Sequence, residues 1–296
     1  MINEKSKQLH GVLTAILTPL DLHGDLAPEH FPALLDFQRN AGIDGVIISG
    51  TNGEGTSLSV AERKQALETA LAHKSSLTVL AGTGAASLTD ALDLTRHAAS
   101  VGAEAVLVLP PFFYKNPTPQ GLADYFLPIL DAAEIPVLLY NIPQHSAIII
   151  SDDLLALLGT HPNLAGIKDS TGDWKSTQHY LTAYPHLKIF AGSDLLACRS
   201  FQNGGNSISG GANAFPECLV AVRDGVKHSA EKGEAAQTRL EALIAITTRY
   251  PFIGVSKSIL AHRGLPRLGV RPPLVSLTPM QEESLLAELR KGGFLA

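Results

Sequence analysis

Eight short, continuous apolar segments recur along this chain as far as Ser209, and amphipathic stretches separate them. Strands of a parallel sheet are buried on both faces, so they are apolar throughout instead of alternating. The pattern therefore predicts parallel strands joined by helices. The predicted strands are Val12–Leu17, Val46–Ile48, Leu77–Ala81, Ala105–Leu109, Val137–Tyr140, Leu164–Ile167, Leu187–Ala191 and Ser207–Ser209.

Helix start signals lie in the gaps between these segments. Ser59–Glu62 has the capping-box pattern, in which each of the two end residues bonds the other's backbone N–H. Ser87 opens the next amphipathic stretch in a similar way, and Thr118 precedes a proline suited to the first helical turn. Strands thus alternate with helices, as connections between parallel strands require.

Eight strand–helix units predict an α/β fold, a (β/α)₈ barrel, over residues 1–214. An open doubly wound sheet is the alternative, but a glycine-rich turn typically follows its first strand. Here that position reads Thr18-Pro19-Leu20. Residues 215–296 have helical patterning with a capping box at Thr278–Gln281, and no flexible linker precedes them. They predict a helical C-terminal extension packed on the barrel.

Composition excludes several classes of function. The formal net charge is −5 and no basic stripe occurs, which argues against a nucleic-acid partner. Cys198 and Cys218 form no CxxC pair, and the eleven histidines lack metal-ligand spacing, so we expect neither a disulfide nor a metal site. Met1–Lys5 lacks the apolar core of a signal peptide, and no apolar run is long enough to span a bilayer. We therefore expect a cytoplasmic protein without a membrane partner.

Lys168 follows the sixth predicted strand directly. A lysine at such a strand end can extend into water or pair with a neighbouring acid, here Asp169. Burial disfavours the ammonium form, however, and a neutral lysine amine is the nucleophile that forms a Schiff base with a ketone. Reacting groups of a (β/α)₈ barrel lie at the C-terminal strand ends. Lys168 is therefore a candidate nucleophile.

The second predicted strand leads into Ser49–Gly55, which contains three glycines. Without side chains, glycines let backbone amides approach a bound anion closely, and a carboxylate is the natural ligand. Thr51 and Asn52 add side-chain donors. The alternative is an ordinary tight turn.

Tyr140 ends the fifth predicted strand, where its hydroxyl can transfer protons or simply pack with one hydrogen bond. Gly192 and Gly210 leave room at the seventh and eighth strand ends, either for a substrate or as steric relief. A nucleophile, a proton carrier and a carboxylate cradle on neighbouring strand ends are what a Schiff-base carbon–carbon lyase needs.

The motifs Gly50–Glu54, Tyr140–Pro143 and Gly166–Asp169 closely resemble those of the dihydrodipicolinate synthase/N-acetylneuraminate lyase family. The resemblance covers essentially the whole chain, and the spacing of the motifs fits. It implies a pyruvate-dependent class I aldolase or related lyase on a (β/α)₈ barrel with a helical tail. It also implies a homotetramer built from two tight dimers, with small-molecule substrates and no metal or organic cofactor.

The resemblance assigns a role to each matching residue. Lys168 matches the Schiff-base lysine and Tyr140 the proton-transfer tyrosine. Thr51 and Asn52 match the positions that hold the carboxylate of the 2-oxo acid, and Thr51 is expected to hydrogen-bond Tyr140. Further expected substrate-binding residues are Gly53, Gln144, His145, Ser170, Gly192, Asp194, Ile208 and Gly210. The family's relay tyrosine at the dimer interface aligns with Phe113, and the adjacent Tyr114 is the alternative relay.

Departures from the family patterns bear on the second substrate. Dihydrodipicolinate synthases carry an arginine where this chain has His145, and Thr-Thr where it has Thr51-Asn52. Sialic acid lyases carry an acidic residue at Leu195 and a serine at Gly210. The chain is more similar to aldolases for 2-keto-3-deoxy sugar acids or 4-hydroxy-2-oxoglutarate. The alternatives are a 4-hydroxy-tetrahydrodipicolinate (dihydrodipicolinate) synthase and, from another class, a non-catalytic 2-oxo acid binding protein.

Overall fold

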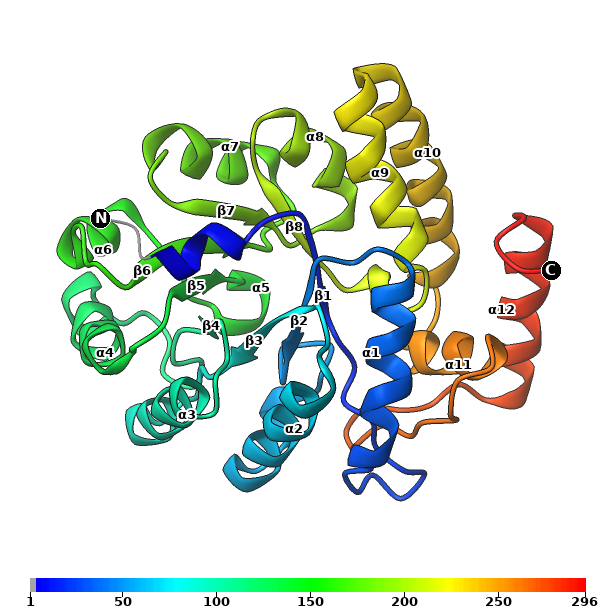
Figure 1. Cartoon of the computed structure of the whole chain (residues 1–296), viewed down its shortest axis with the longest axis horizontal. Coiled ribbons are helices and arrows are strands. Elements are labelled where there is room, and N and C mark those ends of the chain that lie inside the picture. Colours follow the sequence, from blue (N-terminus) through cyan, green and yellow to red (C-terminus); the bar gives the residue numbers. More distant parts are fainter. Residues whose placement is uncertain (1–3) are drawn as a thin grey trace.

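The computed structural model describes residues 4–296, and a closed barrel of eight parallel strands forms its centre (Figure 1). The strands follow one another in sequence order, and β8 pairs with β1 to close the barrel. Met1–Asn3, part of the stretch expected to lack a signal peptide, lie outside the described residues. The strands are β1 (Val12–Ala15), β2 (Gly45–Ile48), β3 (Thr78–Gly82), β4 (Ala105–Val108), β5 (Val137–Asn141), β6 (Leu164–Asp169), β7 (Lys188–Ala191) and β8 (Asn206–Ser209).

The barrel confirms all eight predicted strands, with two notable differences at their ends. β1 stops at Ala15 instead of Leu17, because the Leu17 amide leaves the ladder and donates to Oδ1 of Asn213 (2.9 Å). β6 continues past its predicted end and includes Lys168, because it keeps pairing with β5 there. The candidate nucleophile is thus held by the sheet itself and not by a loop.

Helices surround the strands, and the predicted start signals are confirmed. Ser59 and Thr278 each form a complete capping box, while Ser87 and Thr118 each accept a backbone N–H at their helix starts. The helices are α1 (Phe31–Asn40), α2 (Val60–His73), α3 (Leu88–Ser100), α4 (Pro119–Ala132), α5 (Pro143–Ser146), α6 (Asp152–Leu158), α7 (Trp174–Ala183), α8 (Ala197–Gln202), α9 (Pro216–His228), α10 (Ala230–Thr247), α11 (Gly254–His262) and α12 (Pro279–Lys291). Short 3₁₀ turns are η1 (Glu4–Gln8), η2 (Pro28–His30), η3 (Gly55–Ser57), η4 (Asp194–Leu196) and η5 (Gly211–Asn213).

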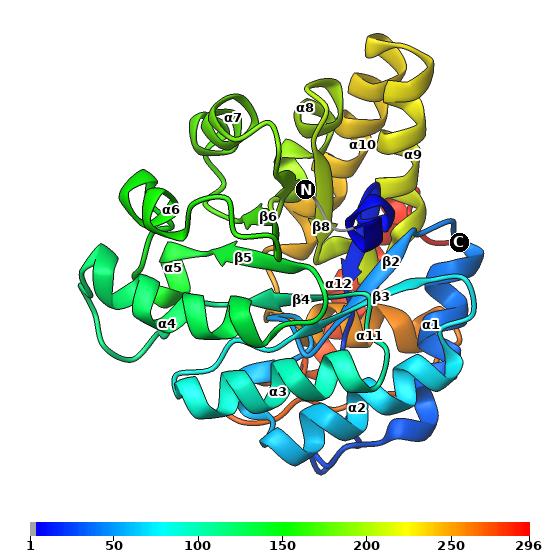
Figure 2. The same cartoon turned by 60° about the vertical axis from the view of Figure 1, so that its left-hand side comes forward.

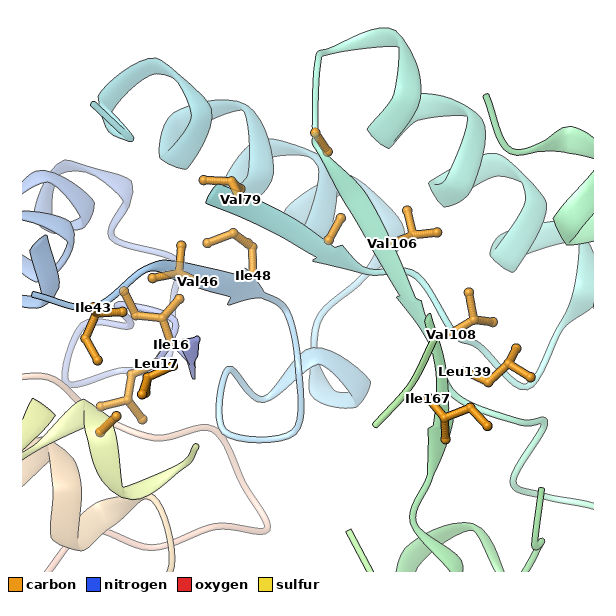
Figure 3. Close-up of a cluster of buried hydrophobic side chains, with 14 of the residues drawn as sticks. Ile16, Leu17, Ile43, Val46, Ile48, Val79, Val106, Val108, Leu139 and Ile167 are labelled. Carbon is orange, nitrogen blue, oxygen red and sulfur yellow. The ribbon is translucent and has the colours of Figure 1, made fainter. Parts of the chain in front are cut away.

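Apolar side chains pack on both sides of the barrel wall, which explains why the strands read as continuous apolar runs. Outward-facing residues such as Val46, Ile48 and Leu139 lie between the strands and the helices (Figure 3). Inward-facing residues alternate with them along each strand and fill the barrel interior. This inner cluster includes Leu13, Ile47, Leu80, Leu138, Phe190 and Ile208, with Leu9 from the N-terminal segment.

Helices α9–α12 follow β8, as the helical patterning predicted. α10 packs on α9 and α8, and both α10 and α11 contact α12. Figure 2 shows the last helices, in orange and red, behind the strands. We propose that the barrel ends at Ala214 and that the extension begins at Phe215. The first helix of the extension, α9, also contacts β1 and so completes the ring of helices around the strands. Among the helices of residues 4–296, none combines the length and apolar character needed to cross a membrane.

Candidate active site

Lys168 of β6 lies beside Tyr140 of β5 inside the barrel. The two residues are paired in register on adjacent strands, so their side chains project from the same face. Nζ of Lys168 lies 4.1 Å from the centroid of the Tyr140 ring, and only 3% of Lys168 is exposed. The alternative in which this lysine extends into water is therefore wrong.

Asp169 faces away from Lys168, because successive residues of a strand project to opposite sides. Its Oδ2 accepts a hydrogen bond from Oγ1 of Thr177 on α7 (2.7 Å), and its Oδ1 accepts one from Nδ2 of Asn141 (2.9 Å). Thr171 donates to the same carboxylate. These bonds hold the carboxylate outside the barrel wall, so the alternative in which Asp169 neutralises Lys168 is also wrong.

The Tyr140 hydroxyl meets Oγ1 of Thr51 at 3.2 Å, which confirms the hydrogen bond that the family resemblance implied. Burial raises the pKa of the Tyr140 phenol, but the charge of Lys168 and hydrogen bonds with Thr51, Lys168 and Ser170 outweigh it. The pKa of Tyr140 is therefore lowered overall. A phenol with a lowered pKa releases its proton more readily, which suits proton transfer.

The glycine loop after β2 (Ser49–Gly55) folds back tightly on itself. Ser49 (φ 56°) and Glu54 (φ 54°) both adopt the left-handed backbone region that residues with side chains disfavour. Gly55 is needed because a Cβ there would lie 2.0 Å from the carbonyl oxygen of Ser49. Such strain in a non-glycine backbone is typical of functional loops.

Two of the three loop residues expected to bind substrate reach the site. Thr51 and Asn52 line the cavity above Lys168. Gly53 does not line it, and its carbonyl oxygen instead accepts a hydrogen bond from Oγ1 of Thr18 (2.5 Å). The carboxylate-binding role of the loop stays a prediction for Thr51 and Asn52.

Gly192 and Gly210 make room for neighbouring side chains of the site. A Cβ at Gly192 would lie 1.8 Å from Oγ of Ser170 and 3.1 Å from Cε of Lys168. A Cβ at Gly210 would lie 2.6 Å from Nδ2 of Asn52. Any larger residue at these positions must therefore displace a group of the candidate site.

A cavity of about 590 Å³ opens above Lys168 at the C-terminal strand ends. Its size is typical of small-molecule sites. Its far wall comes from the extension, with Leu240, Leu243 and Ile244 of α10, Phe252, and Val255 of α11. Ten predicted substrate-binding or catalytic residues besides Lys168 line it: Thr51, Asn52, Tyr140, Gln144, His145, Ser170, Gly192, Asp194, Ile208 and Gly210.

Asp194 lines the cavity with a buried carboxylate, although the residue as a whole is partly exposed. Its Oδ2 accepts a hydrogen bond from the Gly211 N–H (2.9 Å), and its Oδ1 has no partner among the described residues. Burial raises the pKa of this carboxyl, against the opposing effects of Ser209, Gly211 and Lys168. Because Oδ1 is itself inaccessible to solvent, this oxygen lies behind the surface of the cavity wall.

Gln144 and His145 are exposed at the mouth of the cavity, and Nε2 of Gln144 donates to the Ser170 carbonyl oxygen (2.6 Å). Phe113 and Tyr114 lie on the loop between β4 and α4, packed edge to face and 72% and 79% exposed. Neither lines the cavity within this chain. The candidate relay residues are thus not brought to Tyr140 by the fold of this chain.

The sequence did not predict a buried ion pair behind the glycine loop. Nζ of Lys257 on α11 lies 2.6 Å from Oε1 of Glu54, and the two side chains are 2% and 0% exposed. Lys257 also donates to the Gly269 carbonyl, and Oε2 of Glu54 accepts the Arg271 N–H (2.8 Å). The pair connects the loop to the extension. The signal that could have revealed it is one lysine in the otherwise uncharged run Gly254–Leu260.

Metal ligands do not cluster in the described part of the chain. Within residues 4–296, no three His, Cys, Asp or Glu side chains lie close enough together to hold a metal ion. Cys198 and Cys218 are both buried and free.

A sequence model of the dihydrodipicolinate synthetase family matches residues 8–291, nearly the whole chain. The chain belongs to this family. It is therefore a carbon–carbon lyase, which confirms the family and the enzyme class predicted from the motifs. Membership in the dihydrodipicolinate synthetase family favours an enzyme over the non-catalytic binding protein considered above.

Relatives of the dihydrodipicolinate synthetase family extend over the full chain. An uncharacterized DapA-like lyase of Chloroflexus aurantiacus is 39% identical over 288 residues, which cover 94% of this chain and 95% of that protein. A 4-hydroxy-tetrahydrodipicolinate synthase of Nitrosospira multiformis is 32% identical, with 96% of each chain covered. The crystal structure of a dihydrodipicolinate synthase from Acinetobacter baumannii complexed with pyruvate has a TM-score of 0.90 and 28% identity, covering 97% of this chain and 99% of its own.

Proposed function

We propose that this lyase forms a Schiff base between Lys168 and pyruvate or another 2-oxo acid. One observation carries the proposal: Nζ of Lys168 lies over the Tyr140 ring, while the Tyr140 hydroxyl bonds Thr51. A buried amine next to a phenol with a lowered pKa can capture a ketone and then move a proton beside it. The iminium serves as the electron sink, so the chemistry uses no metal or organic cofactor.

In the cleavage direction, the neutral Lys168 amine adds to C2 of a 4-hydroxy-2-oxo acid. The Tyr140 phenol gives its proton to the C2 oxygen, which leaves as water, so that an iminium and a Tyr140 phenolate remain. The Tyr140 phenolate takes the proton of the C4 hydroxyl, and the C3–C4 bond breaks to release an aldehyde. The bonding electrons pass to the iminium and form an enamine instead of a carbanion. Tyr140 returns the proton to C3. Water then releases pyruvate and the free amine, and the proton set free in this step goes back to the Tyr140 phenolate.

The carboxylate of the 2-oxo acid is proposed to bind at Thr51 and Asn52. Both residues line the cavity, and the strained loop that carries them is anchored by buried bonds to the extension. The related A. baumannii enzyme was crystallised with pyruvate, which supports the same class of ligand here. Thr51 then serves both the substrate and Tyr140.

For the second substrate, we propose a 2-keto-3-deoxy sugar acid or 4-hydroxy-2-oxoglutarate as the compound cleaved. His145 stands where a dihydrodipicolinate synthase has an arginine, and it is exposed at the cavity mouth. Condensation of pyruvate with aspartate semialdehyde is the alternative, and the relatives at 32% identity favour it. Turnover of aspartate semialdehyde that exceeds cleavage of 2-keto-3-deoxygluconate and 4-hydroxy-2-oxoglutarate would establish the alternative.

We further propose a homotetramer built as a dimer of dimers, in which Tyr114 reaches the site of a partner subunit. Phe113 and Tyr114 form an exposed aromatic pair, and such patches mark protein interfaces. Light scattering measures the assembly directly. Phe113→Ser with Tyr114→Ser should weaken it, whereas a monomeric wild-type protein would contradict the proposal.

Borohydride trapping tests the Schiff base. Pyruvate with sodium borohydride should reduce the iminium to a stable secondary amine on Lys168, located by peptide mass spectrometry. Lys168→Ala should abolish the adduct. Lys175→Ala changes an exposed lysine of α7 and should leave it unchanged. No adduct, or an adduct on another lysine, contradicts the proposal.

A further inference from the structure

The cavity above Lys168 has a far half that belongs to the extension and lies beyond the reacting groups. Phe215, Leu243 and Ile244 contribute to this far wall. Leu195 and Phe252 also line the cavity, yet they are 52% and 55% exposed. Large apolar side chains left exposed around a cavity indicate a ligand with apolar surface.

Most hydroxyl groups of this far wall are already engaged within the protein. Oγ1 of Thr248 and Oγ1 of Thr247 donate to carbonyl oxygens one turn earlier on α10 (2.8 and 3.3 Å). The Tyr250 hydroxyl donates to Oε1 of Glu288 on α12 (2.8 Å). Ser256 is the remaining hydroxyl-bearing residue of the wall. These hydroxyls keep acceptor lone pairs, but their protons are already used. The wall therefore offers sugar hydroxyls few hydrogen-bond donors and much hydrocarbon surface, which suits a row of such hydroxyls poorly.

Charges around the cavity disfavour an anionic aldehyde. Of the described residues that line it, Lys168 is the only lysine and none is an arginine. The positive charge of the Lys168 iminium is neutralised by the carboxylate of the bound 2-oxo acid itself. Asp194 repels an anion whenever it is ionised, and His145 lies at the exposed mouth. A second carboxylate or a phosphate therefore has no buried cationic partner.

Polar groups gather instead close to Lys168. Ser170 approaches Lys168 beside Gly192, and Ser193 and Asp194 line the cavity directly after β7. These groups suit the oxygen on the carbon that forms or breaks the bond. The cavity is therefore polar at its reacting end and apolar at its far end.

We propose that the aldehyde partner is uncharged and carries an aliphatic or aromatic substituent, which packs against α10 and Phe252. In the cleavage direction, the substrate class is a 4-hydroxy-2-oxo acid with a hydrocarbon group on C4. This inference rests on the Schiff-base chemistry of the proposed function alone. It competes with the sugar acid and the 4-hydroxy-2-oxoglutarate proposed there, because the aldehydes released from those substrates are hydroxylated or charged. In condensation, C3 of the enamine bonds the aldehyde carbon, the aldehyde oxygen takes a proton from Tyr140, and water releases the product from Lys168.

A series of aldehydes with pyruvate tests the inference on the wild-type enzyme. The probes are the unbranched alkanals from propanal to hexanal, with benzaldehyde, glyceraldehyde, glyoxylate and aspartate semialdehyde. kcat/KM should rise about fourfold for each added methylene until the far half is filled. Hexanal should exceed glyceraldehyde and glyoxylate by at least about tenfold. A flat alkanal series, or a preference for a charged or hydroxylated aldehyde, overturns the inference.

Variants of the far wall sharpen the test. Ile244→Ser should flatten the rise with chain length, and Ile244→Arg should increase the rate with glyoxylate. Leu157→Ser removes an exposed leucine of α6 that does not line the cavity, so it should leave the series unchanged. If a variant fails to fold, the aldehyde series on the wild-type enzyme still tests whether the aldehyde partner is apolar.

Trapping with pyruvate alone separates this inference from the function on which it rests. An adduct on Lys168 together with no chain-length dependence overturns the inference and leaves the Schiff-base proposal standing. Absence of the adduct overturns both. Phe252→Ser with an altered oligomeric state and an unchanged aldehyde preference would show that Phe252 packs against another subunit, and it also overturns the inference.

Discussion

Nζ of Lys257 lies 2.6 Å from Oε1 of Glu54, and both side chains are almost completely buried. The lysine belongs to the C-terminal extension, and the glutamate belongs to the strained loop that carries Thr51 and Asn52. The same carboxylate accepts the Arg271 N–H. Part of the candidate carboxylate site is therefore held in place by residues outside the strands.

Removal of one member of this pair should be strongly destabilising. Lys257→Met leaves the buried Glu54 carboxylate without its partner, which we expect to cost about 3–5 kcal/mol of unfolding free energy. Combining it with Glu54→Gln should recover part of the loss. Denaturant unfolding measures both variants, with the exposed Lys227→Met as control. A single variant as stable as the wild type contradicts the pairing.

Tyr140 should titrate at a lower pH than ordinary phenols. Its pKa is lowered from 10.0, whereas burial raises the pKa of Tyr125 and of Tyr184 to about 12. The near-ultraviolet absorbance of tyrosinate should therefore show a step below pH 10 that Tyr140→Phe removes. Lys168→Met takes away the positive charge, so it should shift this step to higher pH. A step that stays in place contradicts the coupling of the two residues.

A methyl group at position 192 should impair Schiff-base formation. In Gly192→Ala, the new Cβ would lie 1.8 Å from Oγ of Ser170 and 3.1 Å from Cε of Lys168, so at least one group must move. A displacement of this size should lower kcat/KM on the order of 100-fold. Ser170→Gly in the same chain should restore part of the rate of trapping. Gly121→Ala, where the new Cβ would lie 3.4 Å from Oγ1 of Thr118, is the control.

Acid should weaken the contact between the extension and α2. Arg271 bonds Glu62 and lowers the pKa of that carboxyl from 4.5 to about 2. The native state thus binds this proton less readily than the unfolded chain, and the contact stabilises the fold fully above pH 4.5. The contribution is lost as pH falls from 4.5 toward 2. The difference in Tm between wild type and Glu62→Gln should accordingly shrink as the pH is lowered from 7 to 3.5. A difference that stays constant contradicts the predicted contribution of the Arg271–Glu62 contact.

The strands and the position of the nucleophile at a strand end could be predicted because both follow from local pattern. Continuous apolar runs identify strands buried on both faces, and the motif around Lys168 identifies the strand end that carries it. The partner of Glu54 could not be predicted, because Lys257 lies far away in the sequence and joins it through the fold. The far wall was missed because an apolar helix face such as Leu243 and Ile244 has the same pattern whether it packs on a core or lines a cavity.

The direction of the Asp169 side chain could not be predicted. Whether it pairs with Lys168 or faces outward depends on how residues alternate along the strand. The predicted strand ended before both residues, so it left their directions open. Once β6 includes them, pairing with β5 directs Lys168 inward and Asp169 toward Thr177. Phe113 and Tyr114 differ from both residues, because the fold leaves their side chains exposed.

Successive side chains of β6 point alternately into and out of the barrel. The chemistry of this enzyme therefore depends on the number of residues in β6 before Lys168 as well as on their identity. Deletion of one residue before Lys168 would carry the carboxylate of Asp169 into the cavity and turn the amine out toward α7. An electrophile-capturing centre would become an acidic one without any substitution. The substrate specificity of such an enzyme can therefore change by substitution of side chains around the cavity. Insertions or deletions within this strand would abolish the chemistry.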